Sequence, residues 1–253
     1  MIVIEAEQGS AEWHQARAGV ITASMFKIAR SKVGLLDERQ QRYVNAIRSG
    51  FTIEGAKDAA GYKSRPTSST IDRALAGEKI GEPSEGAKSY ARRLALERIC
   101  GAVLSDDFET WAMRRGRELE PDARRAHEIR AGVMVETCGL VLTGDRLFGA
   151  SADGLIDDDG GAEYKCLVSP DEIYKVWADD ISEYIDQVQG GMWLTGRVWW
   201  DFVMYCPALA PVGRDLYLRR IPRDDAYIEA LESDLIDFNR LVEQYKREFL
   251  KEQ

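Results

Sequence analysis

The sequence contains few of the residues on which several common kinds of site depend. Among 253 residues there are 2 His, His14 and His127, so histidine-based zinc or HNH-type hydrolysis lacks its ligands. The 4 Cys stand singly, without CxxC spacing, which argues against a zinc knuckle or a disulfide framework, and we expect reduced thiols. No apolar run approaches the roughly 18 residues of a membrane span, and the first residues carry Glu where a signal peptide carries Lys or Arg. We therefore expect a cytoplasmic protein with no membrane partner.

Basic residues are also in the minority. The chain has 34 Lys and Arg against 43 Asp and Glu, a formal net charge of -9. This balance argues against a protein that coats nucleic acid through bulk positive charge. It does not exclude a nuclease, because such an enzyme can confine its positive charge to one channel and needs carboxylates for its metal.

The order of the predicted elements favours an α/β fold. Periodic apolar residues predict helices at 12–17, from about Thr22 or Ser24, and at 84–101, 110–130, 182–195 and 224–250. In the helix at 110–130 we expect Trp111, Met113, Leu119 and Ala123 to face the core. Short β-branched and apolar runs predict strands at 133–136, 139–143, 148–156, 162–168, 199–205 and 216–221. We expect one domain, residues 1–253, with a central mixed sheet flanked by helices.

Residues 37–83 differ in character from the rest and predict a helical insertion. Three amphipathic stretches end at Gly50, Gly61 and Gly77, and Gly suits the end of a helix. Small residues at 55–61 also resemble a helix-turn-helix unit, in which two helices cross closely. The insertion could grip DNA, or it could serve packing or contact between subunits.

The segment with the clearest chemistry is a predicted hairpin around the turn at 157–161. Folding the chain back at this turn brings Asp153 near Glu163. Alternation along the second strand places Glu163 and Lys165 on one face. A buried charged trio needs a partner, and a divalent ion between the two carboxylates would supply one, with Lys165 placed to steady an attacking water. An exposed hairpin with a surface Glu–Lys pair is the alternative.

Two further segments fit the same site in the order of the chain. Glu120, in a predicted helix, could reach the metal as another carboxylate, although a solvated charged turn would also explain it. Gln187 and Gln189 interrupt an apolar helical face near Met192, where buried amides would need hydrogen-bond partners such as a phosphate or water network. An exposed polar stripe is the alternative there.

Six motifs in series resemble the family of phage lambda exonuclease and the YqaJ-type viral recombinases, which have a PD-(D/E)XK, restriction-endonuclease-like core. The order and spacing agree over most of the chain outside the insertion. Each motif alone is weak, and the series of six is what carries the resemblance. The motifs are WHQAR at 13–17, GVITAS at 19–24, Gly116 with Glu120, SADG at 151–154, EYKC at 163–166, and QVQ at 187–189 with Met192 and Trp193.

The resemblance implies a Mg²⁺-dependent 5′-to-3′ exonuclease, with Mn²⁺ as a possible substitute, that acts on double-stranded DNA. It implies release of mononucleotides, a 3′ single strand left for recombination, a single-strand-annealing protein as partner, and a trimeric ring around DNA. It also implies a phage or prophage gene expressed in a bacterial host.

The resemblance also assigns roles to positions of this chain. It implies two metal ions bound by Asp153, Glu163 and Glu120 with the main-chain carbonyl of Tyr164, and a catalytic Lys165. It implies a pocket for the 5′-phosphate formed by the residues Arg17, Ser24, Ser151 and Gln187.

Two departures from the family pattern and two alternative functions stay open. Ala152 stands where the family usually has Pro, and the segment 37–83 is additional. Ala152 removes no ligand, so we expect activity to survive it. A structure-specific or restriction-like endonuclease could use the same metal core. A non-catalytic helix-turn-helix DNA-binding protein is the alternative from another class, but it would have no need of Asp153, Glu163 and Lys165 together.

Overall fold

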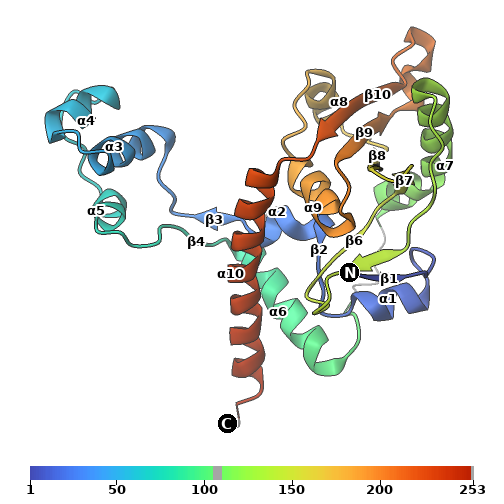
Figure 1. Ribbon diagram of the computed structural model, residues 1–253, viewed down its shortest axis with the longest axis horizontal. Coiled ribbons are helices and arrows are strands. Elements are labelled where there is room, and N and C mark those ends of the chain that lie inside the picture. Colours follow the sequence, from blue (N-terminus) through green and yellow to red (C-terminus); the bar gives the residue numbers. More distant parts are fainter. Residues whose placement is uncertain (105–109, 252–253) are drawn as a thin grey trace. The chain divides into compact units, whose positions relative to one another are not determined.

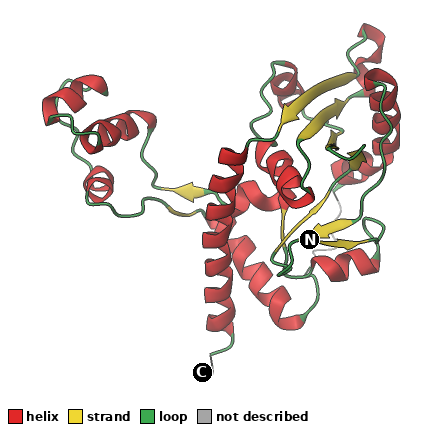
Figure 2. Cartoon of the chain, viewed as in Figure 1, coloured by secondary structure: helices red, strands yellow, loops and turns green. Residues whose placement is uncertain are grey.

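A computed structural model describes residues 1–104 and 110–251. The chain forms two compact units, one made of Met1–Arg30 with Ser89–Gln253 and the other of Ser31–Lys88. The second unit extends beyond the expected insertion at 37–83 on both sides. Figure 1 follows the chain through its elements, and Figure 2 shows the strands and helices of each unit.

The first unit contains two four-stranded sheets. In the first sheet the order is β1 (Ile2–Ile4), β5 (Leu140–Leu142), β6 (Phe148–Ser151) and β2 (Ile21–Thr22). In the second sheet it is β10 (Leu216–Pro222), β9 (Trp199–Tyr205), β8 (Gly160–Lys165) and β7 (Gly154–Ile156). The pairs β2–β6 and β8–β9 are parallel and the others antiparallel, so both sheets are mixed.

The expectation of a continuous strand at 148–156 is wrong. The chain leaves the first sheet after Ser151 and enters the second at Gly154, so Ala152 and Asp153 form a crossing between the sheets. A Cβ on Gly154 would lie 2.1 Å from Val135 Cγ1, so only Gly fits where β7 begins. The strand expected at 133–136 is also wrong, since only an isolated bridge between Glu136 and Leu155 forms there.

The helices of the first unit begin and end with recognisable caps. The Thr110 hydroxyl accepts from the Met113 amide at the start of α7, and Gly132, with φ 67°, ends that helix. The Asp224 carboxylate caps α10 in the same way, by accepting from the Tyr227 amide. The bounds are α1 (Ala11–Arg17), α2 (Phe26–Ala29), α6 (Glu85–Cys100), α7 (Trp111–Ala131), α8 (Pro170–Trp177), α9 (Ile185–Thr195) and α10 (Asp225–Phe249), with the 3-10 turns η1 (Ala23–Met25) and η2 (Pro207–Val212).

The helices α9 and α7 cover opposite faces of the second sheet. The alternation of side chains along β9 shows which face each helix covers. Trp200 and Phe202 pack with Val188 and Met192 of α9. On the other face Val203 packs with Ala123 of α7. The two faces of β8 therefore differ in their surroundings, because its residues pair in register with those of β9.

The expectation that Trp111 and Met113 face the core is wrong. Their relative exposures are 67% and 60%, and the fully buried residues of α7 are Ala123 and His127. The first half of α7 is therefore held by few apolar contacts. No helix within the described residues is long and apolar enough to cross a membrane.

The second unit has a small core of its own. It contains α3 (Glu38–Arg48), α4 (Ile53–Ala59) and α5 (Ser69–Leu75), with the two-stranded pair β3 (Lys32–Val33) and β4 (Glu82–Pro83). Asp37 and Gln40 form a capping box at the start of α3. Tyr43, Val44, Ala56, Ala60, Ile71 and Ala74 are buried together between the three helices.

Candidate functional site

A cavity of about 920 Å³ opens in the first unit, between α1, α7, α9 and the strands β6 and β8. It brings together the residues that were assigned to the metal site and the phosphate pocket, although these come from six separate motifs. Gln189 is not among them: it donates to the Pro222 carbonyl and accepts from the Asp224 amide. The predicted residues that line it are Arg17, Ser24, Glu120, Ser151, Asp153, Glu163, Tyr164, Lys165 and Gln187.

The centre of the cavity holds a Lys–Glu–Gln triangle. The Lys165 ammonium lies 2.6 Å from Glu163 Oε1, as alternation along β8 predicts. Gln187 of α9 donates to the same Glu163 oxygen over 2.6 Å and accepts from Lys165 Nζ over 3.1 Å. Gln187 thus lies against the acidic group, although the resemblance implied that it belongs to the phosphate pocket.

Asp153 is held at the crossing between the sheets by a main-chain hydrogen bond. Its Oδ2 accepts from the Tyr164 amide over 2.8 Å, which fixes the carboxylate beside β8. Burial, and then repulsion from Glu163, raises the pKa of Asp153 well above its usual value, although Lys165 opposes the shift. Asp153 is therefore a buried carboxylate with a second carboxylate, Glu163, close to it.

Glu120 reaches the same group from α7 and carries its own counter-charge. Arg124, one turn further along, donates to Glu120 Oε1 over 3.0 Å and to the main-chain carbonyl of Asp153 over 3.2 Å. Burial raises the pKa of Glu120, with repulsion from Glu163 adding to it and Arg124 opposing it. Arg124 was not singled out from the sequence, although its four-residue spacing from Glu120 was visible there.

The three carboxylates suit a divalent cation by their chemistry. Asp153, Glu163 and Glu120 offer hard oxygen ligands, and burial raises the pKa values of Asp153 and Glu120, with repulsion from Glu163 adding to both shifts, so a bound cation would favour their charged forms. Within the described residues, no three His, Cys, Asp or Glu side chains are already grouped tightly enough to hold a metal. Lys165 and Arg124 are their present partners, so bound metal would take over part of the pairing.

A second polar group lies at the end of the cavity formed by α1. Trp13 donates through Nε1 to Ser151 Oγ over 2.8 Å, and the Arg17 guanidinium lies over the Trp13 ring, 4.2 Å from its centroid. Arg17 also donates to Thr22 Oγ1 over 3.2 Å, and Ser24 Oγ lies 3.5 Å from that hydroxyl. Burial lowers the pKa of Arg17, and the nearby Tyr90 and Glu97 oppose the shift.

The second helix expected near Thr22 or Ser24 begins later than predicted. Residues Ile21–Thr22 form β2, and the 3-10 turn η1 follows before α2 starts at Phe26. The Thr22 hydroxyl makes no cap hydrogen bond and is engaged with Arg17 instead. The Thr22 side chain therefore contributes to the cavity rather than to a helix end.

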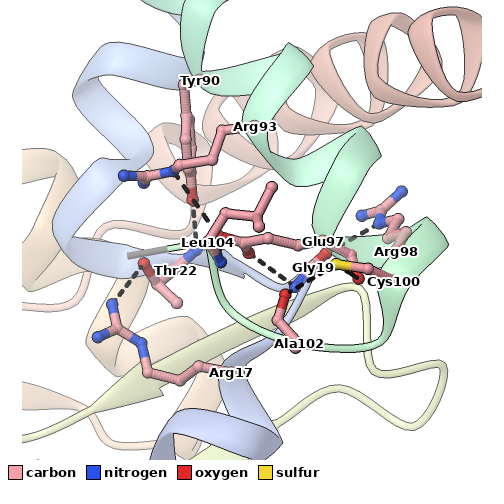
Figure 3. A network of polar contacts seen from close by, with 10 residues as sticks. All are labelled: Arg17, Gly19, Thr22, Tyr90, Arg93, Glu97, Arg98, Cys100, Ala102 and Leu104. Atoms are coloured by element: carbon pink, nitrogen blue, oxygen red, sulfur yellow. Dashed lines mark hydrogen bonds and ion pairs between the residues drawn. The ribbon is translucent and has the colours of Figure 1, made fainter. Parts of the chain in front are cut away.

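The loop between Arg17 and Thr22 is fixed from α6, as Figure 3 shows. Glu97, buried on α6, accepts from the Gly19 amide over 3.0 Å. Tyr90 accepts from the Thr22 amide over 3.3 Å. Gly19 has φ 72°, and a Cβ there would lie 2.5 Å from Arg98 Cγ, so the turn requires Gly.

Sequence reasoning missed several residues that support the site. Trp13 was recognised only as part of a motif, and its indole N–H bond to Ser151 joins segments 138 residues apart. Glu97, Tyr90 and His127 act from elements whose spatial neighbours cannot be inferred from periodicity. His14 lies edge-on to the neighbouring Trp13 ring, with ring centroids 5.0 Å apart, and also lines the cavity.

Several solved structures have a fold similar to this one. The structure is similar to the alkaline exonuclease LHK-Exo from Laribacter hongkongensis, at 27% identity over 95% of this chain and 96% of that chain, with a TM-score of 0.67. The complex of LHK-Exo with dAMP gives a TM-score of 0.69 at the same identity and coverage. A phage related exonuclease from Haemophilus somnus 129PT shares the fold at 15% identity, over 91% and 96% of the two chains, with a TM-score of 0.60.

No curated protein sequence matches the chain significantly. The sequence model of the YqaJ-like viral recombinase domain matches residues 60–198, more than half of the chain. That match includes the acidic residues Glu120, Asp153 and Glu163 as well as Lys165. The fold is a mixed α/β fold like that of the alkaline exonuclease, with a PD-(D/E)XK-like core. The chain belongs to the family of YqaJ-like viral recombinase domains.

Proposed function

We propose that this protein is a metal-dependent exonuclease that degrades double-stranded DNA from 5′-phosphorylated ends in the 5′-to-3′ direction. It releases mononucleotides and leaves a 3′ single strand. The observation that carries the proposal is that one cavity contains both an acidic group with a lysine and, at its other end, a half-buried arginine with hydroxyls. The similarity to an alkaline exonuclease supports the same reaction class.

The acidic group supplies the hydrolytic half of the proposal. Asp153, Glu163 and Glu120, with the main-chain carbonyl of Tyr164, would hold Mg²⁺ or Mn²⁺, and two ions would activate water and neutralise the leaving oxygen. Lys165 lies at the edge of this group, where its ammonium can orient the attacking water and offset the charge that develops on the phosphate. Gln187 holds the side chains of Lys165 and Glu163 in position through its two hydrogen bonds.

The hydroxyl-lined end supplies recognition of the DNA end. Arg17 is preorganised by the Trp13 ring and Thr22, and Ser24 and Ser151 present hydroxyls to the same cavity. A phosphate dianion there would accept charge-assisted hydrogen bonds from Arg17, whose side-chain hydrogen bond within residues 1–104 and 110–251 goes to the Thr22 hydroxyl. Binding the terminal phosphate at this end would leave the next phosphodiester near Asp153.

The family resemblance extends the proposal to assembly and partners. A trimeric ring around DNA would reconcile the net charge of -9 with DNA binding, because the positive charge needs to face only the channel. A single-strand-annealing protein would receive the 3′ strand. Mass measurement by light scattering tests the ring, with a trimer mass expected and a monomer mass contradicting it.

Incubation of linear duplexes labelled at either end tests the function. With Mg²⁺ we expect loss of nucleotides from 5′-phosphorylated ends, slower loss from 5′-hydroxyl ends, and none in EDTA. Closed circular DNA is the control and should remain intact. Cleavage of the circle would favour an endonuclease, and binding without cleavage under all conditions would favour a DNA-binding protein.

A further inference from the structure

A buried polar chain joins α7 to three strands of the second sheet, on the face opposite Lys165. His127 Nδ1 lies 3.0 Å from the Tyr164 hydroxyl, and His127 Nε2 lies 3.2 Å from Asp201 Oδ2. Arg220 of β10 completes the chain with two hydrogen bonds to Asp201, of 2.9 and 2.8 Å. His127 is 0% exposed and Asp201 1% exposed, so this chain replaces what would otherwise be apolar core.

Burying polar and charged groups in a protein core costs desolvation free energy. Here the hydrogen bonds between the buried groups offset that cost. Burial alone would raise the pKa of Asp201, but the hydrogen bonds from Arg220 and His127 outweigh it and hold that pKa below its usual value. The partners are consistent with His127 donating from Nε2 to the carboxylate and accepting at Nδ1 from the Tyr164 hydroxyl. Every polar atom of the imidazole is used.

The position of His127 on α7 links this chain to the acidic group. Glu120, Arg124 and His127 follow one another at spacings of four and three residues, so they share a face of the helix. Tyr164, the partner of His127, lies between Glu163 and Lys165, and its amide holds Asp153. His127 thus connects α7, the helix that carries Glu120, to β8, the strand that carries Glu163.

His127 acts beside other polar contacts of α7: Arg124 donates to Glu120 and to the Asp153 carbonyl, and Arg115 donates to the Cys166 carbonyl over 3.4 Å. Arg124 and Arg115 are partly exposed, and His127 is the fully buried polar side chain of this helix. Ala123 and His127 are its fully buried residues, and Ala123 offers no directional contact. Pro121 follows Glu120 directly and has no amide hydrogen, so the series of helical hydrogen bonds is interrupted at this turn and the helix is weakened there. Trp111 and Met113, upstream, are exposed and add little anchoring.

We propose that His127 is a positioning residue that docks α7 on β8 and so holds Glu120 at the metal site. This inference rests on the proposed function, because it assigns His127 a purpose at the cation site proposed there. It predicts that loss of the imidazole weakens cation binding through Glu120, even though His127 touches neither the cation nor DNA.

The test measures Mn²⁺ binding to the full chain, by calorimetry or by the electron paramagnetic resonance of the free ion, with no substrate present. We expect His127→Leu to raise the Mn²⁺ dissociation constant at least about tenfold, the usual loss of metal affinity when a residue that supports the ligands is replaced. In a Glu120→Ala background the same substitution should change the constant little further, because the ligand that it positions is gone. Leu235→Ala, a buried apolar change on α10, is the matched control for lost stability and should bind Mn²⁺ as the wild type does.

Three results would overturn the inference. Unchanged Mn²⁺ binding in His127→Leu would do so, as would an equal fold-change in the wild-type and Glu120→Ala backgrounds, which would indicate a general loss of structure. Wild-type protein that binds no Mn²⁺ would overturn the proposed function and the positioning role with it, so the two failures are distinguishable. If His127→Leu does not fold, Tyr164→Phe carries the test, because it keeps the main-chain carbonyl and removes only the hydroxyl that His127 meets.

Discussion

At the scale of single residues, the Lys165 ammonium is the group with the most specific proposed role. It contacts Glu163 and Gln187 and lies over the Tyr184 ring, 5.5 Å from the centroid. We expect Lys165→Ala to lower the rate of hydrolysis at least about 100-fold, because preorganised charge stabilisation in a site is worth this much. Mn²⁺ binding should stay equal or tighten, since a cation next to Glu163 is removed.

Rates of nucleotide release at saturating DNA, together with Mn²⁺ binding, check this prediction. Lys175→Ala, an exposed lysine on α8, is the control and should match the wild type. Normal turnover by Lys165→Ala would remove this lysine from the mechanism.

The raised pKa of Asp153 leads to a prediction about stability. A carboxyl whose pKa is higher in the folded than in the unfolded protein contributes stability that is present at low pH and is lost as the pH rises through the folded-state pKa. Asp153→Asn removes that loss, so in EDTA at neutral pH it should raise Tm by roughly 2–4 °C for each ~1 kcal/mol regained. Calorimetry should show the difference shrinking as the pH falls, and a difference independent of pH would contradict it.

Arg17 leads to a prediction about substrate choice. Its guanidinium is half-buried against Trp13 and bonds to the Thr22 hydroxyl, so a terminal phosphate is the charged partner that we propose for it. Arg17→Ala should reduce the preference for 5′-phosphate over 5′-hydroxyl ends about 10- to 100-fold, the size of a hydrogen bond to a charged group. Arg240→Ala, whose side chain is 75% exposed, should keep the preference. An unchanged preference in Arg17→Ala would place the phosphate elsewhere.

At the scale of elements, the passage from β6 to β7 depends on a glycine that the packing requires. A Cβ at Gly154 would lie 2.1 Å from Val135 Cγ1, so Gly154→Ala should cost about 1–3 kcal/mol through overpacking. Gly144→Ala is the matched control, because nothing lies within 4 Å of its added Cβ and its φ is not positive. Denaturant unfolding should show a lower midpoint for Gly154→Ala alone, and equal midpoints would contradict the packing argument.

The elements themselves were largely predictable, because their signals are local. The strand Trp199–Tyr205 and the long helix ending at Phe249 lie where periodicity places them. The split at Ala152 and Asp153 was not predicted, since the division depends on strands that pair from far along the chain. Exposure of Trp111 was missed for a similar reason: apolar periodicity reports a face of a helix, and tertiary packing decides how much of it is covered.

At the scale of the whole molecule, the two compact units have separate cores. Ile71 is 1% exposed within the core of residues 31–88, so Ile71→Ala should destabilise that unit by about 2–5 kcal/mol. Hydrogen exchange followed by mass spectrometry should rise within 31–88 and stay unchanged in β8 and α7. Leu235→Ala should do the reverse, and a rise throughout the chain in either variant would indicate one cooperative unit.

The proximity of the site residues to one another was predictable in part. Alternation on β8 placed Glu163 beside Lys165, and the hairpin placed Asp153 near them. The contact of Gln187 with Glu163 joins α9 to β8, and Trp13 with Ser151 joins α1 to β6, so both depend on how whole elements pack. The family resemblance indicated that these residues belong to one site, and the fold shows which of them are in contact.

The crossing between the sheets also has a consequence for how far apart the two ends of the cavity can be. Ser151, which Trp13 holds, and Asp153, which the Tyr164 amide holds, are separated by one residue of a continuous backbone. Two peptide units span at most about 7 Å. Under the proposed function, this short stretch of backbone fixes the distance between the bound 5′-phosphate and the phosphodiester bond that is cleaved. Each turnover would then remove a fixed length of strand.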